Sequence, residues 1–302
     1  MKLLIVASFN KHCFAPFVLE QAEALRRSGC EVAFFGVEGK GIRGYMKALS
    51  ALRTRIRDFS PDVIHAHYGL CGLLANLQRR VPVVTTYHGS DINVKSVRHF
   101  SRLAMALSAY NIFVSKRILE LVSPKRKYGL IPCGIDFSEE QLTPKDVARE
   151  RMKLSPEGHY VLFAGAFDNA VKNYPLAKTA MALVPDAELL ELKGYTREQV
   201  TFLMCAADCF LMTSHTEGSP QVIKEAMACG CPIVSVDVGD VGDVMNGIKG
   251  CYICQRDDVS IADGIRKAIR SGRTNGRDRI VERGLDNTVI ADRLISIYEK
   301  II

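Results

Sequence analysis

The sequence predicts an α/β protein built from two doubly wound, Rossmann-like domains. Apolar runs of strand length alternate with amphipathic stretches of helix length, which is typical of parallel sheets covered by helices. A polar stretch at 138–158, which contains Pro144 and Pro156, interrupts this alternation. We therefore expect one domain over 1–150 and a shorter one over 151–302, with the last helix able to pack back on the first domain.

The first domain is expected to begin with a buried strand, because residues 2–8 form the continuous apolar run that parallel sheets bury on both faces. Further strands are expected at 31–35, 62–66, 82–86, 111–115 and 128–132, and helices at 16–28, 42–59, 97–107 and up to 121. The helix at 42–59 has one apolar face, made of Ile42, Tyr45, Met46, Leu49, Leu52, Ile56 and Phe59. Arg43, Lys47 and Arg57 lie opposite, on a face that either contacts anionic lipid or is simply solvated.

The second domain repeats the alternation. Strands are expected at 160–164, 188–192, 210–213 and 233–236, and helices at 174–184, 197–206, 259–271 and 288–302. A further helix lies between the last two strands. Ser219 is expected to cap its N-terminus with Pro220 at the first helical position, and Gly230 is expected to end it.

Two glutamates frame that helix. Glu217 precedes it and Glu225 lies inside it, at the border of an apolar stripe that contains Val222. The unpaired N–H groups of a helix N-terminus suit a phosphate, and nearby carboxylates accept hydrogen bonds from hydroxyls. The pattern fits a sugar joined to a nucleotide diphosphate, and equally a capped helix with two solvated glutamates.

The segment EGSPQVIKEAMACGCPIV, with Glu217 and Glu225, closely resembles the signature of retaining GT-B glycosyltransferases of the family-four type, glycosyl transferases group 1. The resemblance covers nearly the whole chain. It implies two Rossmann-like domains facing a central cleft, with the second domain shortened. It also implies that Glu217 binds sugar hydroxyls and Glu225 binds ribose hydroxyls. The donor-binding residues that it implies are Gly165, Gly218, Ser219, Pro220, Gln221, Val222, Glu225 and Tyr195.

Two further motifs carry the resemblance. The segment YHGSD resembles the family's histidine-glycine motif, which implies that His88 faces the donor sugar or its phosphate. A histidine there can donate a hydrogen bond, and it titrates near neutral pH. His65 and His67 lie in a second matching segment and are expected to be accessory. Lys172 matches the lysine that neutralises the diphosphate leaving group, but Ala166 stands where the family has an arginine. The catalytic residues are thus expected to be His88, Lys172 and Glu217.

Composition and charge limit the possible partners of the protein and its location in the cell. The start MKLLIVASFN is too short for a signal peptide, and no apolar run is long enough to span a membrane, so we expect a cytoplasmic protein. The ten cysteines are then expected to be structural thiols rather than disulfides or zinc ligands. Residues 1–150 carry 22 Lys and Arg against 13 Asp and Glu, or +9, whereas the rest carries 18 against 20, or −2. The basic first half suggests an anionic partner such as a membrane surface, and no nucleic-acid module is present.

The sequence therefore predicts a retaining glycosyltransferase that moves a sugar from a nucleotide sugar to a glycan or lipid-linked acceptor, in cell-surface polysaccharide synthesis. No cofactor and no metal are expected. One alternative is a catalytically silent GT-B scaffold, which Ala166 and the shortened second domain favour. Another is a GT-B sugar-nucleotide epimerase, which the glutamate pair disfavours. A dehydrogenase is poorly supported because no GxGxxG follows the first strand.

Overall fold

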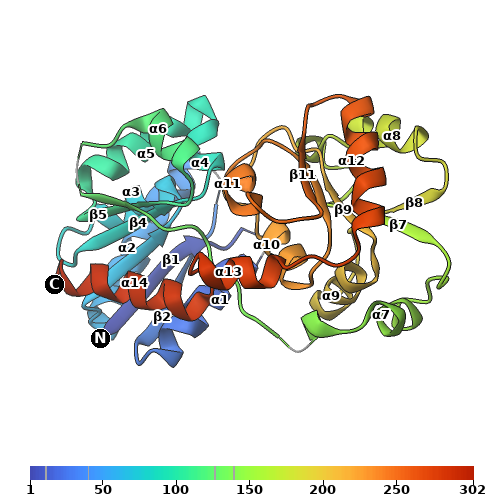
Figure 1. Ribbon diagram of the computed structural model, residues 1–302. Helices are drawn as coiled ribbons and strands as arrows, with labels where there is room; N and C mark the ends of the chain where they lie inside the picture. Colours follow the sequence, from blue (N-terminus) through green and yellow to red (C-terminus); the bar gives the residue numbers. More distant parts are fainter. Residues whose placement is uncertain (11, 40, 126, 139) are drawn as a thin grey trace. The chain divides into compact units, whose positions relative to one another are not determined.

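The computed structural model of the chain contains two compact units (Figure 1), and each is described by itself. The described residues are 1–10, 12–39, 41–125, 127–138 and 140–302, without the side chains of 41–46. Unit 1 comprises Met1–Asp136 and Leu285–Ile302, and unit 2 comprises Phe137–Gly284. Residue 150, where the sequence analysis divides the chain, lies inside a helix of unit 2.

Unit 1 contains a parallel six-stranded sheet in the order β2-β1-β3-β4-β5-β6. Its strands are β1 (Lys2–Ser8), β2 (Glu31–Val37), β3 (Val63–His67), β4 (Val83–Tyr87), β5 (Tyr110–Phe113) and β6 (Tyr128–Leu130). Its helices are α1 (Pro16–Arg27), α2 (Gly41–Phe59), α3 (Gly69–Asn76), α4 (Ser90–Asn93), α5 (Lys95–Leu107), α6 (Lys116–Val122) and α14 (Asn287–Glu299). The strand order runs outward from β1 in both directions, which is the doubly wound arrangement that the sequence predicts.

Both faces of this sheet are buried. Leu3 and Ile5 of β1 pack on one face in a core that includes residues of α1 and α14, and Leu4 packs on the other face with residues of α2 and α3. Successive side chains of a strand point to opposite faces of the sheet, so a strand with both faces buried needs an apolar residue at every position. Part of the predicted apolar face of α2 lies outside what the structure describes, namely the side chains of Ile42, Tyr45 and Met46. The same holds for the side chain of Arg43 on the opposite face. Leu52 and Ile56 are buried in that core, as predicted.

Unit 2 contains a parallel five-stranded sheet in the order β11-β10-β9-β7-β8. Its strands are β7 (His159–Phe163), β8 (Ala187–Leu190), β9 (Cys209–Met212), β10 (Ile233–Val236) and β11 (Cys251–Cys254). Its helices are α7 (Lys145–Arg151), α8 (Tyr174–Ala182), α9 (Arg197–Ala206), α10 (Gln221–Ala228), α11 (Val241–Met245), α12 (Asp258–Ser271) and α13 (Gly276–Glu282), with 3₁₀ turns η1 (Glu140–Leu142) and η2 (Ala170–Lys172).

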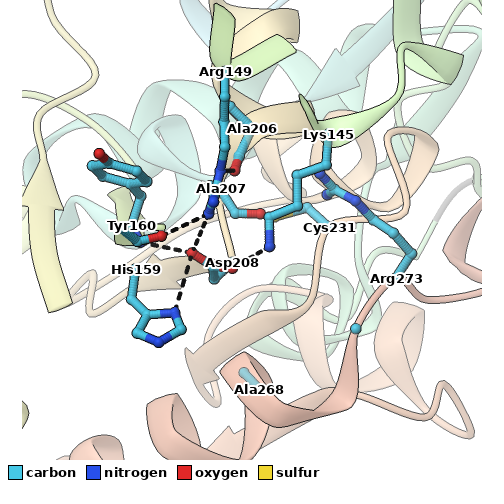
Figure 2. Close-up of polar contacts among 12 residues, drawn as sticks. Lys145, Arg149, His159, Tyr160, Ala206, Ala207, Asp208, Cys231, Ala268 and Arg273 are labelled. Carbon is cyan, nitrogen blue, oxygen red and sulfur yellow. Dashed lines mark hydrogen bonds and ion pairs between the residues drawn. The ribbon is translucent and has the colours of Figure 1, made fainter. Parts of the chain in front are cut away.

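A buried ion pair fixes the start of unit 2 (Figure 2). The carboxylate of Asp208, just before β9, accepts hydrogen bonds from Arg149 of α7 at 2.9 Å and from the backbone N–H of Tyr160 at 2.7 Å. Lys145 donates to the other carboxylate oxygen. The Arg149 guanidinium also donates to the carbonyl oxygens of Ala206 and Gly158. Because every charged partner is paired, the cluster holds α7 against the sheet without leaving a buried charge unsatisfied.

Helix α3 is absent from the predicted set of elements because Gly69 and Gly72 lower the helical signal. The structure explains both glycines. A Cβ atom at Gly69 would lie 2.0 Å from the hydroxyl oxygen of Ser101 on α5, and one at Gly72 would lie 2.5 Å from Thr85 Cγ2 on β4. Close packing of α3 therefore outweighs its poor propensity. The helices α4, α7, α11 and α13 were likewise not predicted.

Candidate active site

A lysine–glutamate pair in unit 2 lies at the carboxyl ends of neighbouring strands. Lys172 Nζ is 2.8 Å from Glu217 Oε1, and both side chains are less than a fifth exposed. Lys172 ends η2, after β7, whereas Glu217 follows β9, the neighbouring strand. Two residues that the sequence analysis assigns to one site, 45 positions apart, are thus in direct contact.

Hydrogen bonds to its backbone carbonyls hold the loop of Lys172 against the end of β9. The Thr213 hydroxyl lies 2.8 Å from the carbonyl oxygen of Lys172, and His215 donates its N–H to the carbonyl of Val171 at 2.9 Å. Gly165 has a φ of +155°, and a Cβ atom there would lie 2.9 Å from Lys172 Cγ. Only glycine therefore lets the lysine stem cross this backbone.

Ser219 does not cap helix α10, which corrects the prediction. The N-cap position is taken by Pro220, with φ −69° and ψ 117°, and no side chain caps it. The Ser219 hydroxyl instead donates to Asp240 Oδ2 at 2.6 Å and accepts from Lys224 Nζ at 2.6 Å. The Ser219 hydroxyl is thus engaged by a buried carboxylate and a buried ammonium instead of the helix N–H groups.

Lys224 is the main feature of this site that the sequence analysis missed. Its side chain is completely buried, and Nζ lies 3.9 Å from the carboxylate of Asp240, which is itself 7% exposed. Burial raises the pKa of Asp240, and Lys224 and the Ser219 hydroxyl oppose that rise. Gly239, with φ +61°, would place a Cβ atom 2.6 Å from the carbonyl oxygen of Gly218. The loop after β10 is therefore locked to the loop that precedes α10.

Glu225 lies one turn into α10 and pairs with Arg197 of α9, with 3.2 Å between the guanidinium and Oε1. Burial raises the pKa of Glu225, and the charges of Arg197 and Lys224 oppose this. Tyr195 lies in the loop before α9 and is 42% exposed, so its ring is open to a ligand. Gly194, beside it, has a φ of +81°.

The loop of Ala166 carries no second cation of its own, but Arg256 lies at the same edge of the sheet. Its guanidinium donates to the carbonyl oxygens of Thr213 and Ser214, at 3.2 and 2.7 Å, after the end of β9. Arg256 forms no ion pair with any carboxylate that the structure describes. By contrast, Lys193 pairs with Asp168 at 2.5 Å.

In unit 1, three histidines form a stack, called here the histidine stack. The rings of His65 and His67 stack at 4.6 Å, and those of His67 and His88 at 5.2 Å. His67 Nδ1 lies 3.0 Å from His88 Nε2, within hydrogen-bond distance, and His88 Nδ1 lies 3.6 Å from Cys133 Sγ. His67 Nε2 is buried and has no hydrogen-bond partner among the described residues.

Burial keeps the histidine stack neutral. It lowers the pKa of His67 to about 3. It also lowers the pKa values of His65 and His88 well below their usual value, and for these two the neighbouring imidazoles add to the effect. The expectation that His88 titrates near neutral pH is therefore wrong. His88 contributes hydrogen bonds rather than positive charge.

A cavity of about 670 Å³ lies beside this stack, at the carboxyl ends of the strands of unit 1. Tyr68, which lines it, has a φ of +73° and packs its ring on His88 at 4.7 Å. Asp91, also in the wall, accepts hydrogen bonds from the N–H groups of Gly69, His88 and Gly89 at 2.9–3.1 Å. Burial raises the pKa of Asp91 to about 6, although those N–H groups oppose it. Backbone strain and a perturbed carboxyl in a cavity are typical of a ligand site.

Within the described residues, no group of three His, Cys, Asp or Glu side chains has the geometry to hold a metal ion. All ten cysteines are free thiols. No described helix has the length and apolar character that crossing a membrane requires.

The two parallel, doubly wound sheets define a protein of the GT-B class. The fold resembles that of sucrose-phosphate synthase from Thermosynechococcus elongatus, with a TM-score of 0.86, 17% identity and coverage of 99% and 98% of the two chains. It also resembles Anabaena HepE in complex with UDP (TM-score 0.73, 16% identity, 99% and 100% covered) and UDP-GlcNAc 2-epimerase from Methanocaldococcus jannaschii (TM-score 0.62, 13% identity, 99% and 100% covered).

Two family models match the chain, "Glycosyltransferase Family 4" over residues 15–139 and "Glycosyl transferases group 1" over residues 175–271. The chain therefore belongs to the group 1, family-four glycosyltransferases. TuaC of Bacillus subtilis, named provisionally as a teichuronic acid biosynthesis glycosyltransferase, is 25% identical over 73% of this chain and 64% of its own length.

Two further relatives match. The amylovoran biosynthesis glycosyltransferase AmsK of Erwinia amylovora is 23% identical over 68% of this chain and 61% of its own. An Escherichia coli UDP-Gal:α-D-GlcNAc-diphosphoundecaprenol α-1,3-galactosyltransferase is 25% identical over 84% and 79%. The matched segments of this chain thus span less than two thirds of the lengths of TuaC and AmsK.

Proposed function

We propose that this chain transfers a sugar from a nucleotide-sugar donor to a hydroxyl of a glycan or lipid-linked acceptor, with retention of anomeric configuration. The observation that carries the proposal is the 2.8 Å pair of Lys172 and Glu217 at the carboxyl ends of β7 and β9. Ligands of doubly wound sheets bind at that edge. In such a pair the lysine ammonium can bind the diphosphate, and the carboxylate can accept hydrogen bonds from sugar hydroxyls.

The chemical need in this proposal is to stabilise the departing diphosphate. Lys172 and the backbone N–H groups at the start of α10 would face its negative charge, and a preorganised cation in a closed site is worth several kcal/mol. Arg256 is the proposed second cation, because Ala166 occupies the usual place of an arginine. Release of its two carbonyl contacts would free the guanidinium for phosphate. No metal is required in this scheme.

Glu217 is proposed to bind sugar hydroxyls and Glu225 the ribose hydroxyls, while Gly165, Gly218, Ser219, Pro220, Gln221, Val222 and Tyr195 surround the donor. Lys224 would act as a positioning residue, since its contacts with Ser219 and Asp240 fix the loop that carries Glu217. His88 is proposed to contact the donor sugar or its phosphate as a neutral imidazole. Retention rests on the family resemblance.

The proposed acceptor site is the 670 Å³ cavity of unit 1, where Tyr68 and Asp91 lie. The names of TuaC and AmsK support a role in cell-surface polysaccharide synthesis, and the name of the Escherichia coli relative supports a lipid-linked acceptor. Peripheral contact with an anionic membrane from the cytoplasmic side would fit such an acceptor.

Two other functions remain candidates. A catalytically silent scaffold is favoured by Ala166. A sugar-nucleotide epimerase shares the fold, as the likeness to UDP-GlcNAc 2-epimerase illustrates, but the contact of Lys172 with Glu217 supports the transferase.

The deciding experiment is a thermal-shift panel of UDP-, GDP- and ADP-sugars with EDTA present. A donor that binds the native state raises the melting temperature by mass action. We expect one nucleotide to give a selective shift that Glu225→Ala abolishes and the exposed control Glu157→Ala retains. Absence of any shift on folded protein would point to the scaffold. Conversion of the donor without an acceptor would point to the epimerase, and NMR of the product anomer tests retention.

A further inference from the structure

A basic groove of about 870 Å³ opens in unit 1 at the amino ends of the strands. It is lined by Val83 at the start of β4, by Ala109 just before β5 and by Lys127 just before β6. His88 follows the other end of β4. Because that strand of five residues spans about 16 Å, the groove is separate from the histidine stack.

Five cations line the groove, namely Arg79, Arg80, Lys125, Lys127 and Lys300. None of the groove residues that the structure describes is acidic, and none of these five cations forms an ion pair with a described carboxylate. An adjoining hollow, which shares Gln78 and Arg80 with the groove, adds Arg53 and also Arg57, which pairs with Asp58 at 3.8 Å. The five cations of the groove itself have no such counter-charge and repel one another, so the groove is suited to an anionic ligand.

The loop that presents two of these cations is strained and held in place. Arg79 has a φ of +60°, which is costly for a residue with a Cβ atom. Gln78, only 7% exposed, accepts from the N–H groups of Arg80 and Val81 at 2.8 and 3.0 Å and donates to the carbonyl of Val81 at 2.7 Å. A buried side chain thus maintains a left-handed arginine at the rim, a pattern found where strain serves a binding site.

We propose that this groove is a second anion-binding site, which takes a phosphate-bearing group. The surroundings favour a phospholipid headgroup as its source. Leu107 lines the groove and is 42% exposed, and Leu103, one turn earlier on α5, is 54% exposed. Exposed leucines beside unpaired cations are typical of surfaces that enter the headgroup region of an anionic membrane. A free polyphosphate offers the same charge without a partner for the leucines.

The proposal is tested with two probes, sedimentation with vesicles of phosphatidylglycerol and phosphatidylcholine and titration with inorganic tripolyphosphate. The test variant is Lys125→Glu/Lys127→Glu. Its matched control is Lys178→Glu/Lys249→Glu, which makes the same charge change at exposed lysines of unit 2. Each cation near an anionic surface strengthens the attraction to it, and the test variant reverses two such charges. We therefore expect the test variant to weaken binding more than tenfold and the control to weaken it less than twofold.

A second variant distinguishes a loss of anion binding from a loss of folding. Arg79→Asn removes a charge but keeps a residue that tolerates a positive φ, so the melting temperature should be unchanged while anion binding weakens several-fold. Binding to anionic vesicles alone identifies a lipid headgroup, and binding to tripolyphosphate alone identifies a soluble phosphate. Binding to neither probe, or equal losses of binding in the test and control variants, would overturn the proposal. The donor-induced thermal shift should be unaffected by the groove variants, so this proposal and the proposed transferase function can fail separately.

Discussion

The hydroxyl of Tyr298 lies 2.6 Å from His65 Nδ1, although 233 residues separate the two in the chain. Both side chains are fully buried. His65 Nε2 lies 2.7 Å from the Thr86 hydroxyl, so both ring nitrogens of His65 have partners and its orientation is fixed. Since His65 stacks on His67 and His67 contacts His88, the last helix of the chain sets the base of the histidine stack.

Replacement of this tyrosine tests how much the contact contributes. Tyr298→Phe removes only the hydroxyl and leaves a buried ring nitrogen without its partner, which costs about 1–3 kcal/mol. We expect that loss in the free energy of unfolding measured with urea. Tyr110→Phe is the matched control, because its hydroxyl bonds the Tyr128 carbonyl at an exposed site. Equal effects of the two substitutions would refute the special role of Tyr298.

The histidine stack predicts a loss of stability in mild acid. The unfolded imidazoles titrate near 6.5, whereas the folded pKa of His67 is about 3 and those of His65 and His88 are also lowered. Between these values the unfolded state binds more protons, so the stabilisation is complete above pH 6.5 and is lost as the pH falls below it. Each extra proton bound contributes about 1.4 kcal/mol per pH unit.

Asp91 acts in the opposite direction, since its pKa is raised from 3.8 to about 6 and the folded state takes up its proton first. Because three imidazoles lower the stability as the pH falls and only one carboxyl raises it, the net effect is a loss of stability. Hydrogen exchange of β3 and β4 amides between pH 7.5 and 5.5 measures this in unit 1 alone. Measuring unit 1 by itself matters because Glu225 and Asp240 in unit 2 also have raised pKa values, which change the stability of that unit with pH. Asp91→Asn should steepen the decline, and protection that is constant with pH would contradict the prediction.

Lys224 should be essential for stability despite its position near the ligand loop. Lys224→Met removes the partner of the buried Asp240 carboxylate, and breaking a buried pair costs about 3–5 kcal/mol. The deficit should shrink as the pH falls, because Asp240 can then take up a proton. Lys224→Met/Asp240→Asn removes both charges and should recover part of the loss. Urea unfolding of the four proteins measures the coupling, and strictly additive effects would show that the pair does not interact.

Lys172 should matter for catalysis more than for folding. In Lys172→Met the diphosphate loses its proposed cation, so kcat should fall by about 10²–10³-fold. The pair with Glu217 is partly exposed, so the free energy of unfolding should change by about 1 kcal/mol or less. Lys178→Met, an exposed lysine on α8, should leave kcat unchanged. An active Lys172→Met enzyme would exclude the proposed role.

Sequence patterns predict the strands and most long helices because burial repeats along them with a regular period. The family resemblance predicts that Lys172 and Glu217 share a site, and the structure shows why they meet, since they follow neighbouring strands of one parallel sheet. Lys224 could not be found in this way. A lysine inside a helix normally extends to solvent, and only the positions of Ser219 and Asp240 make its burial tolerable.

Local signals also failed where a tertiary contact overrides them. Ser219 has the composition of an N-cap, but its hydroxyl is engaged by Lys224 and Asp240. Gly69 and Gly72 disfavour a helix locally, yet their missing side chains let α3 approach α5 and β4. The strain at Arg79 is invisible in the sequence, because it depends on three hydrogen bonds that the neighbouring Gln78 side chain makes, one as donor and two as acceptor.

Unit 2 is inserted between Asp136 and Leu285 of unit 1, and this order has a consequence for synthesis on the ribosome. All strands of unit 1 emerge before unit 2, but α14, which supplies Ile290, Leu294 and Tyr298 to the core of unit 1, is made after unit 2. At a translation rate of about 5–20 residues per second, the strands of unit 1 are made roughly 8–30 s before α14. During that time part of the apolar surface of unit 1 is uncovered, so the nascent chain should depend on chaperones until α14 has been made.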